Sequence, residues 1–332
     1  MDSAKGSYKN ISVVIPTYNR KNMLRSTLLA LEDQSLSKDN FEVIVVSGGS
    51  MDEIEEFFEK SYYSFPLQHI KKQNKGPARA RNEGIKHSKY DLILFLDDDT
   101  QPLRNCLLEH IKMHNLFDRF SVIGKTTSPF IRSEIRSKYP NVYGLPRMQR
   151  LVHKLKDGEV LGWDLFISNN LSVKKSLSTV AMFNQSFPYA SYEDIELGYR
   201  LHEIGVQLIF AERAEALHFQ YRSFEETSCW AVRNGYSKMI MIELHPQLWD
   251  HLVICDKYNF KKPLDLLKID PMPPEKEIKI KNEIQRLERE LLCSPTNKYV
   301  LKRYQRESSK LYAYMEAMGM RKRLQERQKY GC

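Results

Sequence analysis

Apolar runs of strand length alternate with helix-like stretches over the first hundred residues of the chain. The runs "ISVVIP" (11–16), "FEVIVVS" (41–47) and "DLILFLD" (91–97) are nearly continuous and rich in β-branched residues. Between them, residues 21–34 carry apolar side chains at helical spacing, and Pro77 indicates the start of a helix within residues 76–87. Apolar strands separated by helices are typical of a parallel sheet covered on both faces. The pattern predicts an α/β fold, and such sheets bind ligands at the carboxyl ends of their strands.

The rest of the chain follows a different pattern. Residues 120–220 combine short strand-like pieces with one helical segment, "EDIELGYRLHEIG" (193–205). A proline-rich break, "DPMPPEKE" (270–277), precedes two predicted amphipathic helices. Their apolar stripes consist of Ile280, Ile284, Leu287 and Leu291, and of Leu301, Tyr304, Leu311, Met315 and Met318. Two helices cannot bury these stripes alone, so we expect them to pack on the body of the protein, on a partner or on a membrane surface.

The composition is that of a globular protein rather than of a membrane-spanning or secreted one. Apolar residues make up 42% of the 332 residues, and no stretch approaches the roughly 18–20 continuous apolar residues of a membrane span. The polar N-terminal segment lacks the apolar core of a signal peptide. The five cysteines form no CxxC pair, which argues against a disulfide framework or a zinc site. We therefore expect a cytoplasmic protein.

The net charge of +9 is confined to the C-terminal part of the chain. Residues 257–332 hold 19 Lys+Arg and 10 Asp+Glu, which leaves the first 256 residues balanced. Because basic and acidic residues alternate there, the charge does not indicate nucleic-acid binding. Acidic residues also interrupt the basic faces of the helices, which favours packing in a homodimer or on the body. Docking at an anionic membrane surface, at the inner face of the membrane, is the alternative.

Three adjacent aspartates, Asp97, Asp98 and Asp99, follow the apolar run "LILFL" (92–96). Adjacent carboxylates repel one another unless they are solvated or share a cation. Carboxylates at a strand end suit a hard divalent cation, which commonly shares its ligands with phosphates and water. The alternative is an acidic loop in which Asp99 or Thr100 caps the next helix.

Two further segments place polar groups near predicted strand ends. "VIPTYNR" (14–20) closes the first strand with hydroxyl groups and an aromatic ring, or is an ordinary turn in which Asn19 caps a helix. "NKGPARARNEG" (74–84) places Arg79 and Arg81 at a helix start. Guanidinium groups and backbone amides there can hold an anionic or nucleotide ligand, although the same residues could form a solvated face.

Glu193 and Asp194 open the predicted helix of the middle region. The helix dipole favours ionised carboxylates at this position, and an ionised carboxylate aimed at a substrate is a candidate general base. Ordinary acidity of a helix N-terminus is the alternative. His218 lies in a short strand some two dozen residues further on; a lone histidine is usually structural, but beside a cation it is a candidate third ligand.

These five elements, in this order, resemble the family 2 glycosyltransferases of the GT-A fold. The similarity covers roughly residues 9–240 and depends on the order and spacing of its motifs. These motifs are "SVVIPTYNR", "NKGPARARNEG", the Asp-x-Asp motif as "LDDD", "ISNNLSVKKSL", "YEDIELGYRLHEIG" and "ALHFQYRSFEE". The resemblance implies a catalytic domain over residues 8–255 and places the basic helical extension, residues 256–332, outside the family pattern.

The resemblance implies a site for a nucleoside-diphosphate sugar together with Mn²⁺ or Mg²⁺. The residues that would bind the nucleotide are Pro16, Thr17, Tyr18, Arg20, Ser47, Arg81, Asp97 and Asp98. The residues that would coordinate the cation are Asp97, Asp99 and His218. Asn169 and Asn170 fall where the family shapes the sugar pocket.

The resemblance also implies a mechanism. Asp194 would deprotonate the acceptor, and Glu193 would help to place it. A single displacement at the anomeric carbon inverts its configuration, while the cation stabilises the departing diphosphate. The sequence leaves the acceptor open among a saccharide, a lipid-linked sugar, a peptide and a small natural product.

Two departures from the family pattern bear on the substrate. Family members usually carry one or two aspartates after the second strand, whereas this chain has Ser47 and Gly48. Either Ser47 or the backbone reads the base, with UDP as the default, or a different nucleotide binds. The chain also lacks the Gln-x-x-Arg-Trp motif of processive synthases, so we expect one sugar per acceptor rather than a polymer.

Two other functions compete with sugar transfer. A nucleotidyltransferase that makes sugar nucleotides shares a similar sheet, but it needs a Gly-rich, Arg-containing loop directly after the first strand, and "IPTYNR" is not one. A non-catalytic scaffold that binds through the basic tail is the second alternative. The presence of Asp97, Asp99, Asp194 and His218 argues against a degenerate enzyme.

Overall fold

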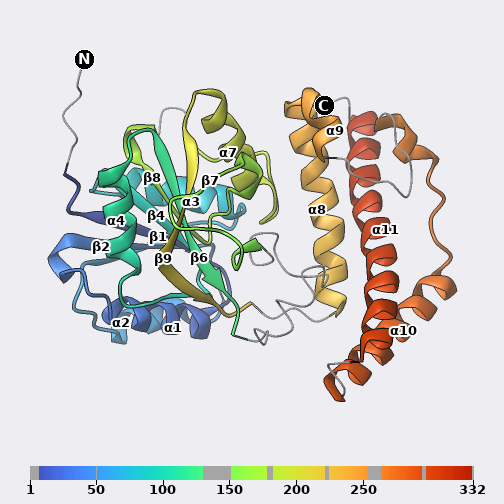
Figure 1. Cartoon of the computed structure of the whole chain (residues 1–332), viewed down its shortest axis with the longest axis horizontal. Coiled ribbons are helices and arrows are strands. Elements are labelled where there is room, and N and C mark those ends of the chain that lie inside the picture. Colours follow the sequence, from blue (N-terminus) through green and yellow to red (C-terminus); the bar gives the residue numbers. More distant parts are fainter. Residues whose placement is uncertain are drawn as a thin grey trace. The chain divides into compact units, whose positions relative to one another are not determined.

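In a computed structural model of the chain, the described residues are 7–49, 51–129, 151–177, 182–220, 224–252, 263–293 and 297–330. Their contacts divide them into two units, each drawn in Figure 1. The sheet unit comprises the described residues up to Gln220, and the helical unit comprises those from Phe224 onward.

The sheet unit is built on one nine-stranded sheet. Its strands are β1 (Ile11–Thr17), β2 (Phe41–Ser47), β3 (Leu67–Lys71), β4 (Leu92–Leu96), β5 (Thr100–Pro102), β6 (Phe120–Thr127), β7 (Val160–Leu161), β8 (Asn170–Lys174) and β9 (Gln207–His218). The order is β3-β2-β1-β4-β8-β6-β9-β5, and β7 pairs with β9. Strands β3, β2, β1 and β4 are parallel, whereas β8 is antiparallel to both of its neighbours. The predicted α/β fold with a mainly parallel sheet is confirmed.

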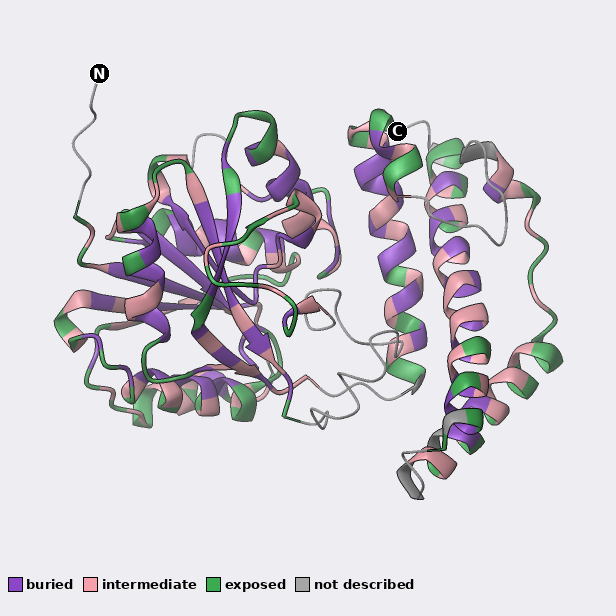
Figure 2. Cartoon of the chain, viewed as in Figure 1, coloured by how far each residue is buried: buried purple, intermediate pink, exposed green. Residues whose placement is uncertain are grey.

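Helices cover both faces of this sheet. Alternate residues of each central strand belong to opposite hydrophobic cores, as Val13 and Val14 do in β1. One core includes side chains from α1 (Lys21–Glu32), α2 (Ile54–Lys60) and α4 (Cys106–Leu116), and the other includes side chains from α3 (Pro77–His87) and α7 (Glu193–Glu203). Figure 2 shows the resulting burial of the strands. Burial on both faces explains why the strand sequences are nearly continuous apolar runs. The described residues of this unit also form the 3₁₀ helices η1 (Lys38–Asn40), η2 (Trp163–Leu165) and η3 (Lys175–Leu177).

The helical unit contains two long helices that approach each other closely. Its elements are α8 (Phe224–Leu244), η4 (Pro246–Leu248), α9 (Trp249–Leu252), η5 (Pro263–Lys268), α10 (Pro274–Cys293) and α11 (Lys298–Tyr330). A Cβ atom at Gly235 of α8 would collide with the backbone carbonyl of Glu316 in α11, and one at Gly319 of α11 would collide with that of Val232 in α8. The two glycines therefore allow backbone-to-backbone packing of the two helices.

The apolar stripes predicted for the C-terminal helices lie in the core of this unit. Ile284 and Leu287 of α10 and Leu311 and Met315 of α11 are buried in one cluster together with Ala231 of α8. The sequence led us to expect that the body, a partner or a membrane surface covers the stripes; in the structure, helices of the same unit, α8 included, cover them.

Helix α8 also explains where the chain divides. The sequence predicts a boundary between residues 255 and 256, which lies outside the described residues. The contacts place the division before α8, because this helix packs against α11. None of the helices within the described ranges is long and apolar enough to cross a membrane.

Candidate active site

The predicted site residues of the first strands meet at one edge of the sheet. Thr17 ends β1 and pairs in register with Ser47, which ends β2. On its other side, β1 is parallel to β4, with Val14 opposite Phe95. The aspartates after β4 therefore emerge beside Thr17, as expected for the carboxyl ends of parallel strands.

Strand pairing brings His218 to the aspartates from a distant part of the chain. The three aspartates form a turn, closed by the N–H of Thr100 donating to the carbonyl oxygen of Asp97 at 3.0 Å. The turn leads into β5, which is antiparallel to β9 and places Thr100 opposite His218. The N–H of Phe219 also donates to the carbonyl oxygen of Asp99, at 2.8 Å. The backbone thus fixes His218 beside Asp99.

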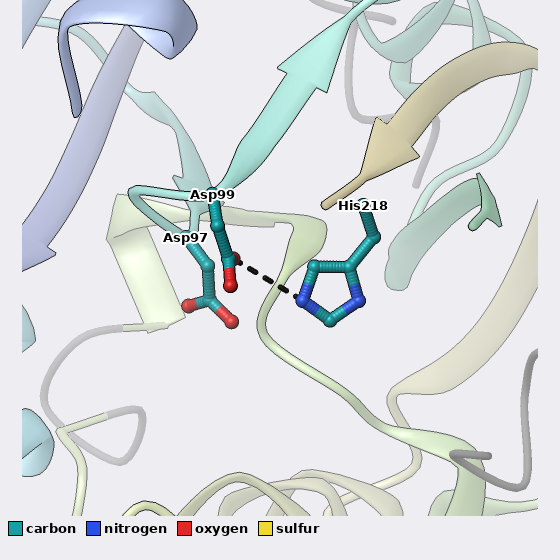
Figure 3. A group of neighbouring side chains, drawn as sticks. All are labelled: Asp97, Asp99 and His218. Carbon is teal, nitrogen blue, oxygen red and sulfur yellow. Dashed lines mark ion pairs between the residues drawn. The ribbon is translucent and has the colours of Figure 1, made fainter. Parts of the chain in front are cut away.

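Asp97, Asp99 and His218 form a candidate cation site, as the sequence predicts. Each offers one ligand atom, and these atoms lie within 4.8 Å of one another. Figure 3 shows the three side chains converging, with His218 Nε2 3.2 Å from Asp99 Oδ1. Asp99 and His218 are buried, whereas the Asp97 side chain is 30% exposed. Two carboxylates and one imidazole are a donor set that suits a divalent cation, and the Asp97 carboxylate is reached by solvent.

Arg20, in the turn between β1 and α1, bonds two of the aspartates. Its Nη1 donates to Asp98 Oδ1 at 2.8 Å, and its Nη2 donates to Asp99 Oδ2 at 2.6 Å. Thr17 Oγ1 donates to the other oxygen of Asp98 at 2.8 Å. Burial raises the pKa of Asp98 to about 7 against the opposing effect of Arg20. Burial also acts to raise the pKa of Asp99, but His218 and Arg20 outweigh it and hold that pKa below its usual value.

A second arginine, Arg81 of α3, joins the aspartates to the start of α7. Its Nη2 donates to Asp97 Oδ1 and its Nη1 donates to Glu193 Oε1, both at 2.9 Å. The Arg81 and Glu193 side chains are almost fully buried. Burial and the neighbouring Asp194 raise the pKa of Glu193 to about 8, although Arg81 opposes the shift. Arg81 therefore connects Asp97, a predicted donor-binding and cation-binding residue, to Glu193, which precedes the predicted base.

Asp194, the predicted base, is fixed by hydrogen bonds to the backbone and to Ser168. Its Oδ2 accepts from the N–H of Ser168 at 3.1 Å and from Ser168 Oγ at 3.3 Å. Its Oδ1 accepts from the N–H of Ile195 at 2.8 Å. Burial raises the pKa of Asp194, and Arg81 and these two amides oppose the shift. A carboxylate with a raised pKa is a stronger proton acceptor once it is ionised.

Several predicted residues lie elsewhere in the local network. The side chain of Asn170 is fully buried: its Oδ1 accepts from His110 Nε2 at 3.0 Å, and its Nδ2 donates to the carbonyl of Ala214 at 2.8 Å. Ser47 Oγ is 2.8 Å from Nε2 of His69 in β3. These contacts tie both residues to the protein framework rather than to the aspartates.

Two neighbours in the opening motif differ in exposure. Pro16 is part of β1, opposite Val46, whereas Tyr18, directly after the strand, is 45% exposed. Ser168 lies in the motif "ISNNLSVKKSL", but the family pattern assigned a role to the two asparagines after it and none to the serine. Only the fold shows that it faces Asp194.

Residues 12–183 match the family model described as "Glycosyl transferase family 2". This match spans more than half of the chain and includes Thr17, Arg81 and the three aspartates. The chain belongs to glycosyl transferase family 2. The family membership that the motifs predict is confirmed.

Related proteins extend this finding beyond the family model. An uncharacterized glycosyltransferase of Bacillus subtilis, YfnE, is 27% identical over 322 residues, which cover 83% of this chain and 78% of that protein. Validoxylamine A glucosyltransferase of Streptomyces hygroscopicus subsp. limoneus is 24% identical, over 76% of this chain and 60% of its own length. Chondroitin synthase of Escherichia coli is 26% identical over 63% of this chain, which spans only 34% of the synthase.

Solved structures show the same fold. A mannosyltransferase from Pyrobaculum calidifontis, in complex with GDP-Man and Mn²⁺, has a TM-score of 0.60 and 15% identity, covering 96% of this chain and 87% of that one. Residues 1–349 of S. aureus TarS, in complex with UDP-GlcNAc, have a TM-score of 0.52 and 15% identity, covering 97% and 92%. The fold of this family 2 chain is thus that of the GT-A glycosyltransferases.

Proposed function

We propose that this family 2 glycosyltransferase moves one sugar from a nucleoside-diphosphate sugar to an acceptor, with a divalent cation and with inversion at the anomeric carbon. The observation that carries the proposal is the convergence of Asp97, Asp99 and His218 next to the Arg81–Glu193 pair that adjoins Asp194. Such a transfer uses a cation for the leaving group and a base for the acceptor, and here one guanidinium connects the candidate residues for both.

The residues have distinct roles in this proposal. A cation held by Asp97, Asp99 and His218 supplies a Lewis acid for the departing diphosphate. Arg81 holds Asp97 and Glu193 in fixed positions, because its buried guanidinium bonds both. Asp194 takes the proton from the acceptor atom as that atom attacks the anomeric carbon. One displacement needs no carboxylate nucleophile, in contrast to retaining glycoside hydrolysis.

We favour a UDP-sugar as donor. The similar TarS structure contains UDP-GlcNAc, whereas the Pyrobaculum enzyme contains GDP-Man, so both bases must be tested. Ser47 stands at the end of β2, where a base-reading aspartate is usual, and its hydroxyl is already engaged with His69. The acceptor is a hydroxyl-bearing or other nucleophilic compound whose proton Asp194 can reach.

A donor panel tests this function. The purified chain is incubated with Mn²⁺ and UDP-, GDP-, ADP- and dTDP-sugars, with and without mixed saccharide acceptors, and the released nucleotide is quantified. We expect one class of donor to release its nucleoside diphosphate, and we expect EDTA and Asp99→Asn to abolish the release. Asp91→Asn, which changes an exposed aspartate before β4, is the matched control.

Two results would overturn the proposal. Release of pyrophosphate from a sugar phosphate and a nucleoside triphosphate would instead identify a nucleotidyltransferase. Full turnover in EDTA would remove the cation from the mechanism, even if the donor were correctly identified.

A further inference from the structure

The two arginines of the site differ sharply in exposure. The Arg81 side chain is 4% exposed and bonds Asp97 and Glu193, so its charge is enclosed in the protein. The Arg20 side chain is 42% exposed, although the carboxylates that it bonds, Asp98 and Asp99, are 5% and 1% exposed. Arg20 therefore covers two buried carboxylates from the solvent side.

Arg20 neutralises the same aspartate that a cation would use. Asp99 Oδ2 accepts from Arg20 at 2.6 Å, while Asp99 Oδ1 faces His218 at 3.2 Å. A divalent cation at Asp97, Asp99 and His218 would share Asp99 with the guanidinium. Two positive groups on one carboxylate repel each other, and low local dielectric strengthens the repulsion. Arg20 in its present position therefore opposes binding of a cation alone.

The position of Arg20 allows it to leave. It follows Asn19, which has a φ of 54°, in the turn between β1 and α1, so its long side chain extends from a loop rather than from a packed helix face. A guanidinium bonds phosphate oxygens as readily as carboxylate oxygens, and in the same two-pronged geometry. A diphosphate at the aspartates would offer Arg20 such oxygens.

We propose that Arg20 is an exchangeable counter-ion, which neutralises Asp98 and Asp99 before the donor binds and bonds the donor diphosphate once the cation is in place. The inference rests on the proposed function and deepens it. Its consequence is that cation and nucleoside diphosphate strengthen each other's binding, because the diphosphate removes Arg20 from Asp99. Arg81 has no such role, since its bonds to Asp97 and Glu193 are enclosed.

The test measures two affinities that should change in opposite directions. Binding of Mn²⁺ alone is measured from the electron paramagnetic resonance signal of free Mn²⁺, and binding of UDP and of GDP at saturating Mn²⁺ is measured by calorimetry. In Arg20→Gln, we expect Mn²⁺ alone to bind about tenfold tighter, an ordinary coupling factor, and the preferred nucleotide to bind weaker by a similar factor. A merely destabilised site would weaken both.

Two further variants separate charge from geometry and from general effects. Arg25→Gln removes an equal charge from an exposed position within α1 and should leave both affinities at the wild-type values. Arg20→Lys keeps the charge but loses the two-pronged bond, so Mn²⁺ affinity should stay near the wild-type value. Circular dichroism confirms that each variant is folded.

The outcomes distinguish this inference from the proposed function. If wild type binds Mn²⁺ and nucleotide but Arg20→Gln binds Mn²⁺ no tighter, the role of Arg20 is refuted and the glycosyltransferase proposal stands. If Arg20→Gln binds Mn²⁺ more tightly than wild type but binds the nucleotide equally well, the proposed move of Arg20 to the diphosphate is refuted. If wild type binds no Mn²⁺ with or without UDP or GDP, both the proposed cation site and the inference fail.

Discussion

The sheet unit and the helical unit are organised by different physical principles. In the sheet unit, the site depends on charge pairs between residues far apart in the sequence, such as Arg81 and Glu193, which are 112 positions apart. In the helical unit, α8 and α11 pack backbone to backbone at Gly235 and Gly319, and apolar stripes of α10 and α11 fill the core. Substitutions in the first unit should therefore change chemistry, and those in the second should change stability.

The largest expected effect lies in the sheet unit. Asp194→Asn keeps the shape of the side chain and removes its proton affinity, so kcat should fall by about a hundredfold or more, since general bases contribute roughly 10²–10⁴. Donor affinity and melting temperature should change little. Steady-state kinetics at saturating donor provide the measurement, with Asp91→Asn as the control. Loss of donor affinity with unchanged kcat would instead place Asp194 in the donor site.

The matching substitution in the helical unit is Gly319→Ala. The new Cβ would collide with the carbonyl of Val232, so α8 and α11 must move apart, at a cost of about 1–3 kcal/mol or more. Urea denaturation should show this loss, while folded protein keeps its nucleotide affinity. Gly158→Ala is the control: a Cβ there meets nothing within 4 Å, and the backbone strain at φ 81° costs about 1 kcal/mol. A loss below about 1 kcal/mol in Gly319→Ala would contradict close packing of these helices.

A smaller effect should follow from Ser168→Ala. The variant loses the hydroxyl contact to Asp194 Oδ2 at 3.3 Å but keeps the backbone amide contact at 3.1 Å. Because the lost bond favours the ionised carboxylate, the pKa of Asp194 should rise and the acidic limb of the kcat profile should move to higher pH. We expect kcat to fall by roughly threefold to tenfold near neutral pH. Ser168→Thr, which keeps a hydroxyl, should restore the profile; an unmoved limb would mean that Ser168 does not act on the base.

The smallest effect concerns the pH dependence of stability without metal. The pKa of Glu193 is raised to about 8 by burial, so the folded state keeps its proton to higher pH than the unfolded state does. Its contribution to stability is complete below the unfolded pKa and is lost as the pH rises through about 8. The melting temperature in EDTA should therefore fall as the pH rises from mildly acidic values to about 8, and level off above that pH. Glu193→Gln mimics the protonated form and should flatten this fall; an equally steep fall in that variant would show that other groups cause it.

The two units also differ in how far the sequence predicts them. Apolar runs predicted the parallel sheet, and the order and spacing of the motifs predicted the family, because both are features of the sequence itself. The grouping of Asp97, Asp99 and His218 was implied by the family resemblance, since the pairing of β5 with β9 that joins them is not local. The apolar stripes of α10 and α11 were also predicted, because their residues recur at helical spacing. Helix α8 was not predicted, because its buried residues, such as Ala231 and Met239, lie in different clusters and leave no single stripe.

The sequence could not predict which side chains of the site bond one another. Nothing local indicates that Arg20 spans Asp98 and Asp99, since the contact depends on how β1 and β4 lie together. The same holds for Asn170, whose position in the family pattern suggested the sugar pocket. Its amide instead bonds His110 and Ala214, because strand β8 directs this side chain into the buried network beside α4.

The central claim is that Asp97, Asp99 and His218 hold a divalent cation at the diphosphate of a sugar nucleotide. Crystals grown with Mn²⁺ and UDP, and in parallel with GDP, allow the metal to be located by its anomalous scattering. We predict one strong anomalous peak within coordination distance of all three side chains, next to the diphosphate oxygens, with Arg20 turned from Asp99 to the phosphate. A bound nucleotide with no peak at these residues, or with the peak elsewhere, would contradict the claim.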